Sequence, residues 1–275
     1  MNSKLIPPNP SEVTVIRRVT PNITTLSAPF LRFGRIKIGG RGTIVRLSSG
    51  ATVVFSPVAL TPQVREAVQS LGGNVRYLVA LDIEHHMFLG QWYEAYPGVQ
   101  VIGPEGLPEK RATQKNENIP FSTVFTNKDK ANQRVTSPPG SEGEFDRDFD
   151  YEYVGSHANK ELVFLYKPDR TVIEADMMFN LPATEQYSKT PESATSGFLT
   201  RLFTGLNSTY GDATWQKRFL WYVASSGDRP DFNASAQRIA KWDFDRIIPC
   251  HGDVIETGAK GIFQKVFAWH LSGHK

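Results

Sequence analysis

Short apolar runs separated by turn residues recur along the first part of the chain and predict antiparallel strands. Residues 13–19 and 23–26 have strand composition on either side of a Pro-Asn turn. Residues 43–47 and 52–55 flank a Ser-Ser-Gly-Ala turn in the same way and predict a hairpin. Charged and apolar residues alternate over 35–38, as in a half-exposed strand. The chain therefore opens with a predicted β-meander.

A strand–helix–strand unit comes next. A helix is predicted over 61–71, because Thr61 is a good N-cap and an apolar stripe follows it. The apolar run 75–80 predicts a buried strand, 87–96 a second helix and 99–102 another short strand. Strands joined through a helix pair in parallel, so we expect a mixed sheet.

The second half of the chain has a similar alternation. Residues 105–147 show a weak pattern that predicts surface loops, with linker composition at 137–143. Strands are predicted at 149–154, 161–166, 170–174 and 246–249, and helices at 231–241 and 261–271. Eight residues of the predicted strands are expected in the core: Leu78, Val79, Val163, Phe164, Val172, Ile173, Ile247 and Ile248.

Residues 180–231 are expected to form a helical insertion, polar at first and then rich in aromatic residues. Helices packed on the core are one interpretation of this segment. A lid over a site near Asp176 is the other, and it would imply an apolar pocket for a hydrophobic small molecule rather than a polymer.

Composition narrows the class of protein. With 275 residues and an apolar fraction of 40%, the chain is long enough for one large domain. No apolar run reaches the ~20 residues of a membrane span, and the N-terminus has no apolar signal region. Cys250 is the single cysteine, which favours a reducing, cytoplasmic compartment. A net charge of +3, from 31 basic and 28 acidic side chains, gives no reason to expect nucleic acid or a membrane as partner.

Candidate metal ligands gather at the ends of predicted strands. Histidine and carboxylate side chains are common ligands of zinc and iron. The residues in question are His85, His86, His157, Asp176 and His251. Two histidines and a carboxylate, as in His86, His251 and Asp176, would also match the ligand triad of non-haem iron. Each histidine alone could equally be a hydrogen-bonded structural residue.

Several neighbouring residues have a second interpretation. Asp82 and Glu84 either orient a histidine, serve as a general base, or are solvated loop carboxylates. Cys250 is interpreted as a small core residue, and His270 and His274 as exposed.

Three segments carry a family resemblance. They are Gly155-Ser156-His157, the strand 172–176 that ends in Asp176, and 244–252 with its strand followed by Pro-Cys-His-Gly. Over nearly its whole length the chain resembles the metallo-β-lactamase fold superfamily. This resemblance implies one domain over 1–275 with the α/β architecture of an αββα sandwich, in which two mixed sheets carry helices on their outer faces. It also implies metal ions in a groove between the tops of the two sheets.

The chain departs from the family at the motif His-x-His-x-Asp-His. Residues 81–86 read Leu-Asp-Ile-Glu-His-His, so Leu81 and Ile83 replace two histidines, His85 replaces the aspartate and only His86 is retained. The family's first metal site loses two of its three protein ligands, leaving His157. A second site of His85, His86 and His251, with Asp176, could remain. The chain thus resembles a divergent branch with fungal and bacterial members.

The resemblance implies a metal-dependent hydrolase with a reduced, mononuclear site that acts on a small molecule. The catalytic candidates are His85, Glu84 and Asp82, and the expected cofactor is one divalent ion, zinc ahead of iron, or none. A catalytically silent binding protein and a mononuclear iron redox protein are the alternatives. The oligomeric state is left open.

Overall fold

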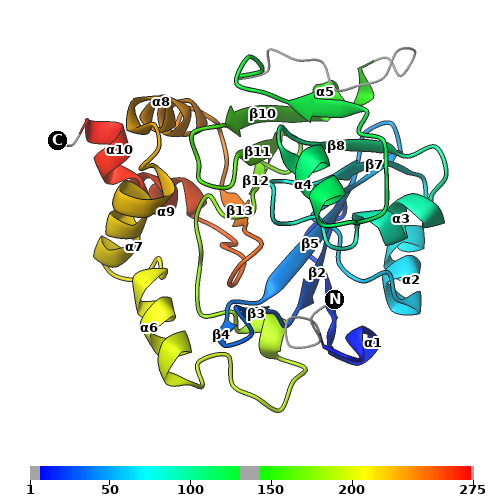
Figure 1. Ribbon diagram of the computed structural model, residues 1–275, viewed down its shortest axis with the longest axis horizontal. Coiled ribbons are helices and arrows are strands. Elements are labelled where there is room, and N and C mark those ends of the chain that lie inside the picture. Colours follow the sequence, from blue (N-terminus) through cyan, green and yellow to red (C-terminus); the bar gives the residue numbers. More distant parts are fainter. Residues whose placement is uncertain (1–6, 131–142, 274–275) are drawn as a thin grey trace.

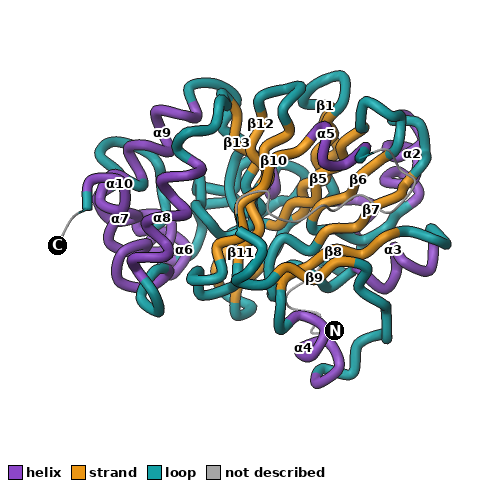
Figure 2. The backbone as a smooth tube through the Cα atoms, turned by 90° about the horizontal axis from the view of Figure 1, so that it is seen from above, coloured by secondary structure: helices purple, strands orange, loops and turns teal. Residues whose placement is uncertain are grey.

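The computed structural model describes residues 7–130 and 143–273, so all but the last residue of the expected linker at 137–143, and His274, lie outside the described residues. Two sheets pack face to face, with helices on both outer sides (Figures 1 and 2). The larger sheet has the order β1 (Val15–Arg18), β2 (Ile23–Ala28), β5 (Gly40–Arg46), β6 (Thr52–Phe55), β7 (Val75–Val79), β8 (Gln100–Pro104), β9 (Thr123–Phe125). The smaller has the order β10 (Phe149–Val154), β11 (Glu161–Tyr166), β12 (Thr171–Ile173), β13 (Arg246–Ile248).

Alternation along the strands creates the layer between the sheets. In β7, Tyr77 and Val79 face this inner layer, whereas Leu78 faces the opposite way. In β11, Phe164 meets them from the other sheet. This period of two is what a strand with two buried faces requires, because successive side chains point to opposite sides.

Helices bury the outer face of each sheet. The apolar cluster on the larger sheet includes residues of α2 (Pro62–Ser70) and α3 (Leu89–Ala95). The cluster on the smaller sheet includes residues of α8 (Arg229–Ile239) and α9 (Ala259–Val266). The remaining helical segments are α1 (Pro10–Val13), α4 (Leu107–Thr113), α5 (Glu144–Asp148), η1 (Glu185–Tyr187), α6 (Phe198–Leu206), α7 (Thr214–Phe219), η2 (Leu220–Ala224) and α10 (Ala268–Ser272). The predicted αββα sandwich is confirmed.

Strand direction brings the candidate ligands to one edge. Strand β12 runs parallel to β13 and antiparallel to β11, which is itself antiparallel to β10. The loops that follow β10, β12 and β13 therefore leave the same end of the sheet. The loop after β7 joins them, because Leu81 O accepts a hydrogen bond from Leu162 N at 2.6 Å.

Most predicted elements are confirmed, and all eight predicted core residues are buried. Two local predictions are wrong. The segment 105–147, predicted as surface loops, contains α4, β9 and most of α5. Arg111 of α4 is buried because its guanidinium bonds to the loop of His86. His270 is not exposed; it is fully buried against Trp221 and Phe232.

Two smaller features complete the fold. Residues 35–38 do not join the main sheet; β4 (Ile36–Lys37) pairs with β3 (Leu31–Arg32) in a separate hairpin. Among the described residues, no helix has the length and apolarity needed to cross a membrane.

Candidate metal centre

The turn after β7 is organised by Asp82, which is fully buried. Its Oδ1 accepts hydrogen bonds from the backbone nitrogens of Glu84 at 2.8 Å and His85 at 2.7 Å. The same oxygen accepts from His85 Nδ1 at 2.8 Å. This pairing fixes the ring of His85, so that its Nε2 faces away from Asp82.

His251 lies in a turn that only glycine can complete. At Gly252 the φ angle is +89°, and a Cβ would lie 2.1 Å from the backbone oxygen of Asn180. Buried Arg41 donates from Nη1 to the carbonyls of Pro249 and Gly252, each at 2.7 Å. His251 Nδ1 donates to the carbonyl of Gly39 at 2.6 Å, which leaves Nε2 as its free nitrogen.

Asp176 follows β12, and its backbone is held by buried Glu161. Glu161 Oε1 accepts from the backbone nitrogens of Ala175 at 2.6 Å and Asp176 at 3.2 Å. Burial, together with the nearby Asp82 carboxylate, raises the pKa of Glu161 well above its usual value. Asp176 is thereby presented toward the two histidines.

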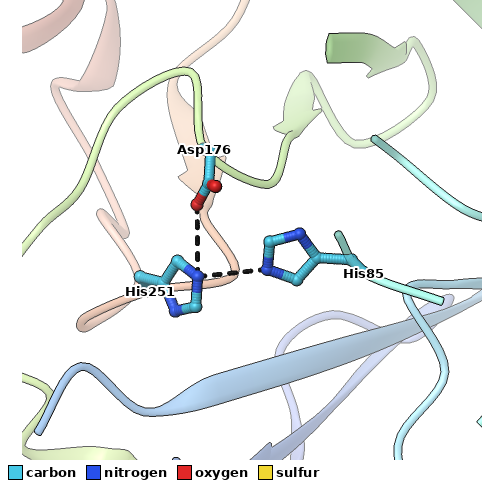
Figure 3. A group of neighbouring side chains, drawn as sticks. All are labelled: His85, Asp176 and His251. Atoms are coloured by element: carbon cyan, nitrogen blue, oxygen red, sulfur yellow. Dashed lines mark hydrogen bonds and ion pairs between the residues drawn. The ribbon is translucent and has the colours of Figure 1, made fainter. Parts of the chain in front are cut away.

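The three side chains converge at one point (Figure 3). His85 Nε2 lies 3.0 Å from His251 Nε2, and His251 Nε2 lies 3.1 Å from Asp176 Oδ1. One ligand atom from each residue lies within 4.8 Å of those of the other two.

The donor set fits a metal ion. Because Nδ1 of each histidine donates to an oxygen, both Nε2 atoms of the neutral rings carry lone pairs. Asp176 Oδ1 is buried and has no hydrogen-bond donor beyond this group. Three electron-pair donors that face one another need a cation between them. A proton can bridge only one pair, whereas a metal ion serves all three.

The charge states follow from the surroundings. Burial lowers the pKa of His85, but the ion pair and hydrogen bond with Asp82 outweigh it and raise the pKa to about 9. Burial raises the pKa of Asp176, yet the nearby rings of His251, His85 and His157 hold it well below the usual range. Without a metal ion, Asp176 is therefore ionised and His85 carries a proton on Nε2, which a metal ion would have to displace.

His86 and His157 lie outside this group. His86 Nδ1 accepts from Arg111 Nη1 at 3.2 Å, and burial together with Arg111 lowers its pKa to about 4. His157 Nδ1 accepts from Asn159 N at 3.1 Å, and burial lowers the pKa of this histidine. His157 is not among the residues whose ligand atoms converge. Of the five expected ligands, the structure brings together His85, Asp176 and His251.

The two carboxylate candidates have different surroundings. Asp82 orients His85, as described above. Glu84 is about half exposed and its Oε1 pairs with Lys110 at 2.5 Å, but it lines the cavity next to the metal centre.

Three groups that support the centre were not predicted from the sequence: Arg41, Asn159 and the Gly39 carbonyl. A single arginine, a single asparagine or a backbone oxygen belongs to no sequence motif that would indicate such a role.

A cavity of about 760 Å³ opens beside the centre, and His85, Asp176 and His251 form part of its wall. Apolar residues make most of the remaining wall: Pro7, Pro10, Val13, Ala28, Pro29, Phe30, Phe33, Pro57, Val58, Ala59, Met87 and Phe88. None of the described residues that line it belongs to 180–231. The lid role of that segment stays a prediction, and the cavity owes its apolar wall to other segments.

Comparisons with known proteins agree with this fold. The profile of a family described as a domain of unknown function (DUF4336) matches residues 32–201, more than half of the chain. No curated protein matches the chain. Among solved structures, the metallo-β-lactamase from Pontibacter korlensis is similar over 94% of this chain and 98% of that one, with 11% identity and a TM-score of 0.56.

Two further structures give the same result. The structure of VMB-1 is similar over 96% of this chain and 99% of that one, with 10% identity and a TM-score of 0.57. The metallo-β-lactamase from Hirschia baltica covers 94% and 97%, with 12% identity and a TM-score of 0.54. Identities this low establish the fold and leave the activity open. The chain belongs to the DUF4336 family, and its fold is that of the metallo-β-lactamases.

Proposed function

We propose that this protein is a metal-dependent hydrolase that acts on a small apolar molecule. Its site lacks part of the family's ligand set and holds a single divalent ion. The convergence of His85 Nε2, His251 Nε2 and Asp176 Oδ1 in a buried group is the observation that carries the proposal. Nδ1 of each histidine donates to an oxygen, so that Nε2 is the nitrogen turned toward the ion.

His85, Asp176 and His251 would hold the ion. When bound, a divalent ion supplies Lewis-acid chemistry and lowers the pKa of water. Asp82 keeps the imidazole of His85 turned toward the centre. Among the described residues that line the cavity, Glu84 is the one carboxylate besides Asp176, and we assign it the role of general base.

The cavity supports a small, largely apolar substrate. Its volume of about 760 Å³ lies in the range of sites for small organic molecules, about 300–1,000 Å³. Arg41 also lines it, but its Nη1 is committed to two backbone carbonyls. An apolar ester, amide or lactone suits these walls better than a highly charged phosphate compound.

The test is the metal content of protein purified without an affinity tag, with single-residue variants in parallel. We expect one zinc ion per chain in the wild type, none in His251→Ala or His85→Ala, and near wild-type content in His86→Asn. His86→Asn is the matched control, because His86 follows His85 directly in the chain but bonds to Arg111, outside the group of ligands. Unchanged metal content in His251→Ala would refute the site assignment. Two tightly bound ions in the wild type would refute the mononuclear site.

A mononuclear iron redox protein is the second candidate. It is favoured by the ligand set itself, because two histidines and one carboxylate are the ligands of many non-haem iron oxygenases. Iron in stoichiometric amount, with a redox-dependent electronic spectrum, would favour this candidate over the hydrolase. Substoichiometric metal that a chelator removes without effect on ligand binding would favour a catalytically silent binding protein.

A further inference from the structure

We propose that Asn159 is a positioning residue that holds one carboxylate oxygen of Asp176 and leaves the other to a single metal ion. This inference rests on the proposed metal site and extends it to a residue that does not itself bind the ion. It explains in physical terms why the centre should take one ion rather than two.

The two oxygens of Asp176 have different partners. Oδ1 faces His251 Nε2 at 3.1 Å, within the group of ligands. Oδ2 accepts a hydrogen bond from the side-chain nitrogen of Asn159 at 2.6 Å. A carboxylate can only accept, so the amide must present its NH2 group to this oxygen. The amide donor therefore occupies the position from which a second cation would approach Asp176.

Asn159 is itself fixed by both halves of the molecule. Its backbone oxygen accepts from Ile83 N at 3.1 Å, in the loop that carries His85. Its backbone nitrogen donates to His157 Nδ1 at 3.1 Å. The amide thus reaches Oδ2 from a backbone that is held by the loop of His85 and by His157 of its own loop.

The two histidine positions of the family motif offer no ligand for a second ion at Oδ2. Leu81 is buried in the apolar layer between the sheets, and Ile83 packs on the cluster under α2 and α3. The two positions that carry histidines in the family motif here carry side chains without lone pairs. An amide donor on Oδ2 satisfies the carboxylate where a second ion would lack ligands.

The test measures zinc stoichiometry and affinity by equilibrium dialysis, with the electronic spectrum of the cobalt-substituted protein as a second readout. Asn159→Leu keeps a similar volume and removes the donor. We expect zinc to bind about 10–100-fold more weakly in this variant, the usual effect of losing a residue that orients a ligand. The cobalt bands should shift, because Asp176 is free to turn and offer both oxygens.

Asn159→Asp keeps the shape and replaces the donor by an acceptor. Two carboxylates that face each other need a cation between them, so zinc uptake at pH 8 should rise from one ion toward two. Asn74→Asp is the control. It makes the same chemical change at an exposed turn before β7, at the opposite end of that strand from His85, and should bind zinc as the wild type does.

The outcomes separate positioning from simple stabilisation. Wild-type zinc affinity and cobalt spectrum in Asn159→Leu would overturn the inference, even if the metal-free variant melts at a lower temperature. One ion in Asn159→Asp would overturn the claim that Asn159 limits the number of ions. If the wild type binds no ion, the proposed function fails as well. If the wild type binds one ion and both Asn159 variants bind zinc as the wild type does, only this inference fails.

Discussion

Arg41 is the residue whose loss should most disturb the turn that carries His251. Its guanidinium is buried, and Nη1 donates to the carbonyls of Pro249 and Gly252, on either side of His251. Nε donates to Ser27 Oγ at 2.9 Å. We predict that Arg41→Met both destabilises the fold and weakens metal binding.

The magnitude follows from the bonds that disappear. A hydrogen bond from a charged donor contributes about 1.5–3 kcal/mol, and a buried acceptor left without a partner costs about 1–3 kcal/mol. Two carbonyls lose their donor in Arg41→Met. Glu185 loses a facing cation at 3.6 Å but keeps Arg17 and Ser27. We therefore expect the free energy of unfolding to fall by about 3–5 kcal/mol, the range for removing one partner of a buried charged interaction.

Urea unfolding followed by tryptophan fluorescence measures the first effect, and zinc competition with a fluorescent chelator measures the second. Zinc affinity should fall about 10–100-fold, because the turn no longer holds His251 in position. Arg35→Met removes an exposed arginine in the same part of the chain and should change stability by less than about 0.5 kcal/mol. A loss below about 1 kcal/mol in Arg41→Met with unchanged zinc affinity would refute the reasoning.

Three further predictions concern pH and the cavity. Because Asp82 outweighs the effect of burial and raises the pKa of His85 to about 9, and a ligand must lose its proton, zinc affinity should rise about tenfold per pH unit between 7 and 9. A flat competition profile over that range would contradict His85 as ligand. Burial lowers the pKa of His270 to about 4, below the ~6.5 of an unfolded chain, so the unfolded state binds more protons between these values and stability is lost as pH falls. By pH 4 the wild type should lose about 3 kcal/mol more than His270→Gln, because His86 titrates in both proteins; urea unfolding at several pH values measures the difference. Phe30→Ala should weaken binding of an apolar ester analogue by about tenfold with unchanged zinc content, since a buried aromatic side chain contributes about 1.5–3 kcal/mol; equal affinity by calorimetry would exclude Phe30 from the binding wall.

The sequence by itself determined which strands are buried. The apolar runs of β7 and β11 predicted that Leu78, Val79, Val163 and Phe164 lie in the core, and all four are buried. Thr61 was identifiable as an N-cap, and its hydroxyl accepts from Val64 N as a cap does. The positions of Asp176 and His251 after strands were also readable, since parallel strands end at one edge of a sheet.

Only the tertiary structure decided which of two adjacent histidines faces the metal centre. The sequence favoured His86 as the ligand beside His251 and Asp176, with His85 in a secondary role, but the structure brings His85 to the centre instead. Neighbours in a turn point in different directions. Asp82 directs His85 inward, whereas Arg111, from a helix that the weak pattern over 105–147 did not predict, holds His86 aside.

The same limit applies to the residues that support the centre. The Gly39 carbonyl and the Asn159 amide act because the chain brings them within 2.6 Å of His251 and Asp176. Gly39 lies 212 residues from His251, and no local pattern records such a contact. Local sequence fixes which side chains are apolar and where strands end, because those properties belong to single residues and their near neighbours. The orientation of a ligand is set by hydrogen bonds between distant segments, which exist only once the two sheets have packed together.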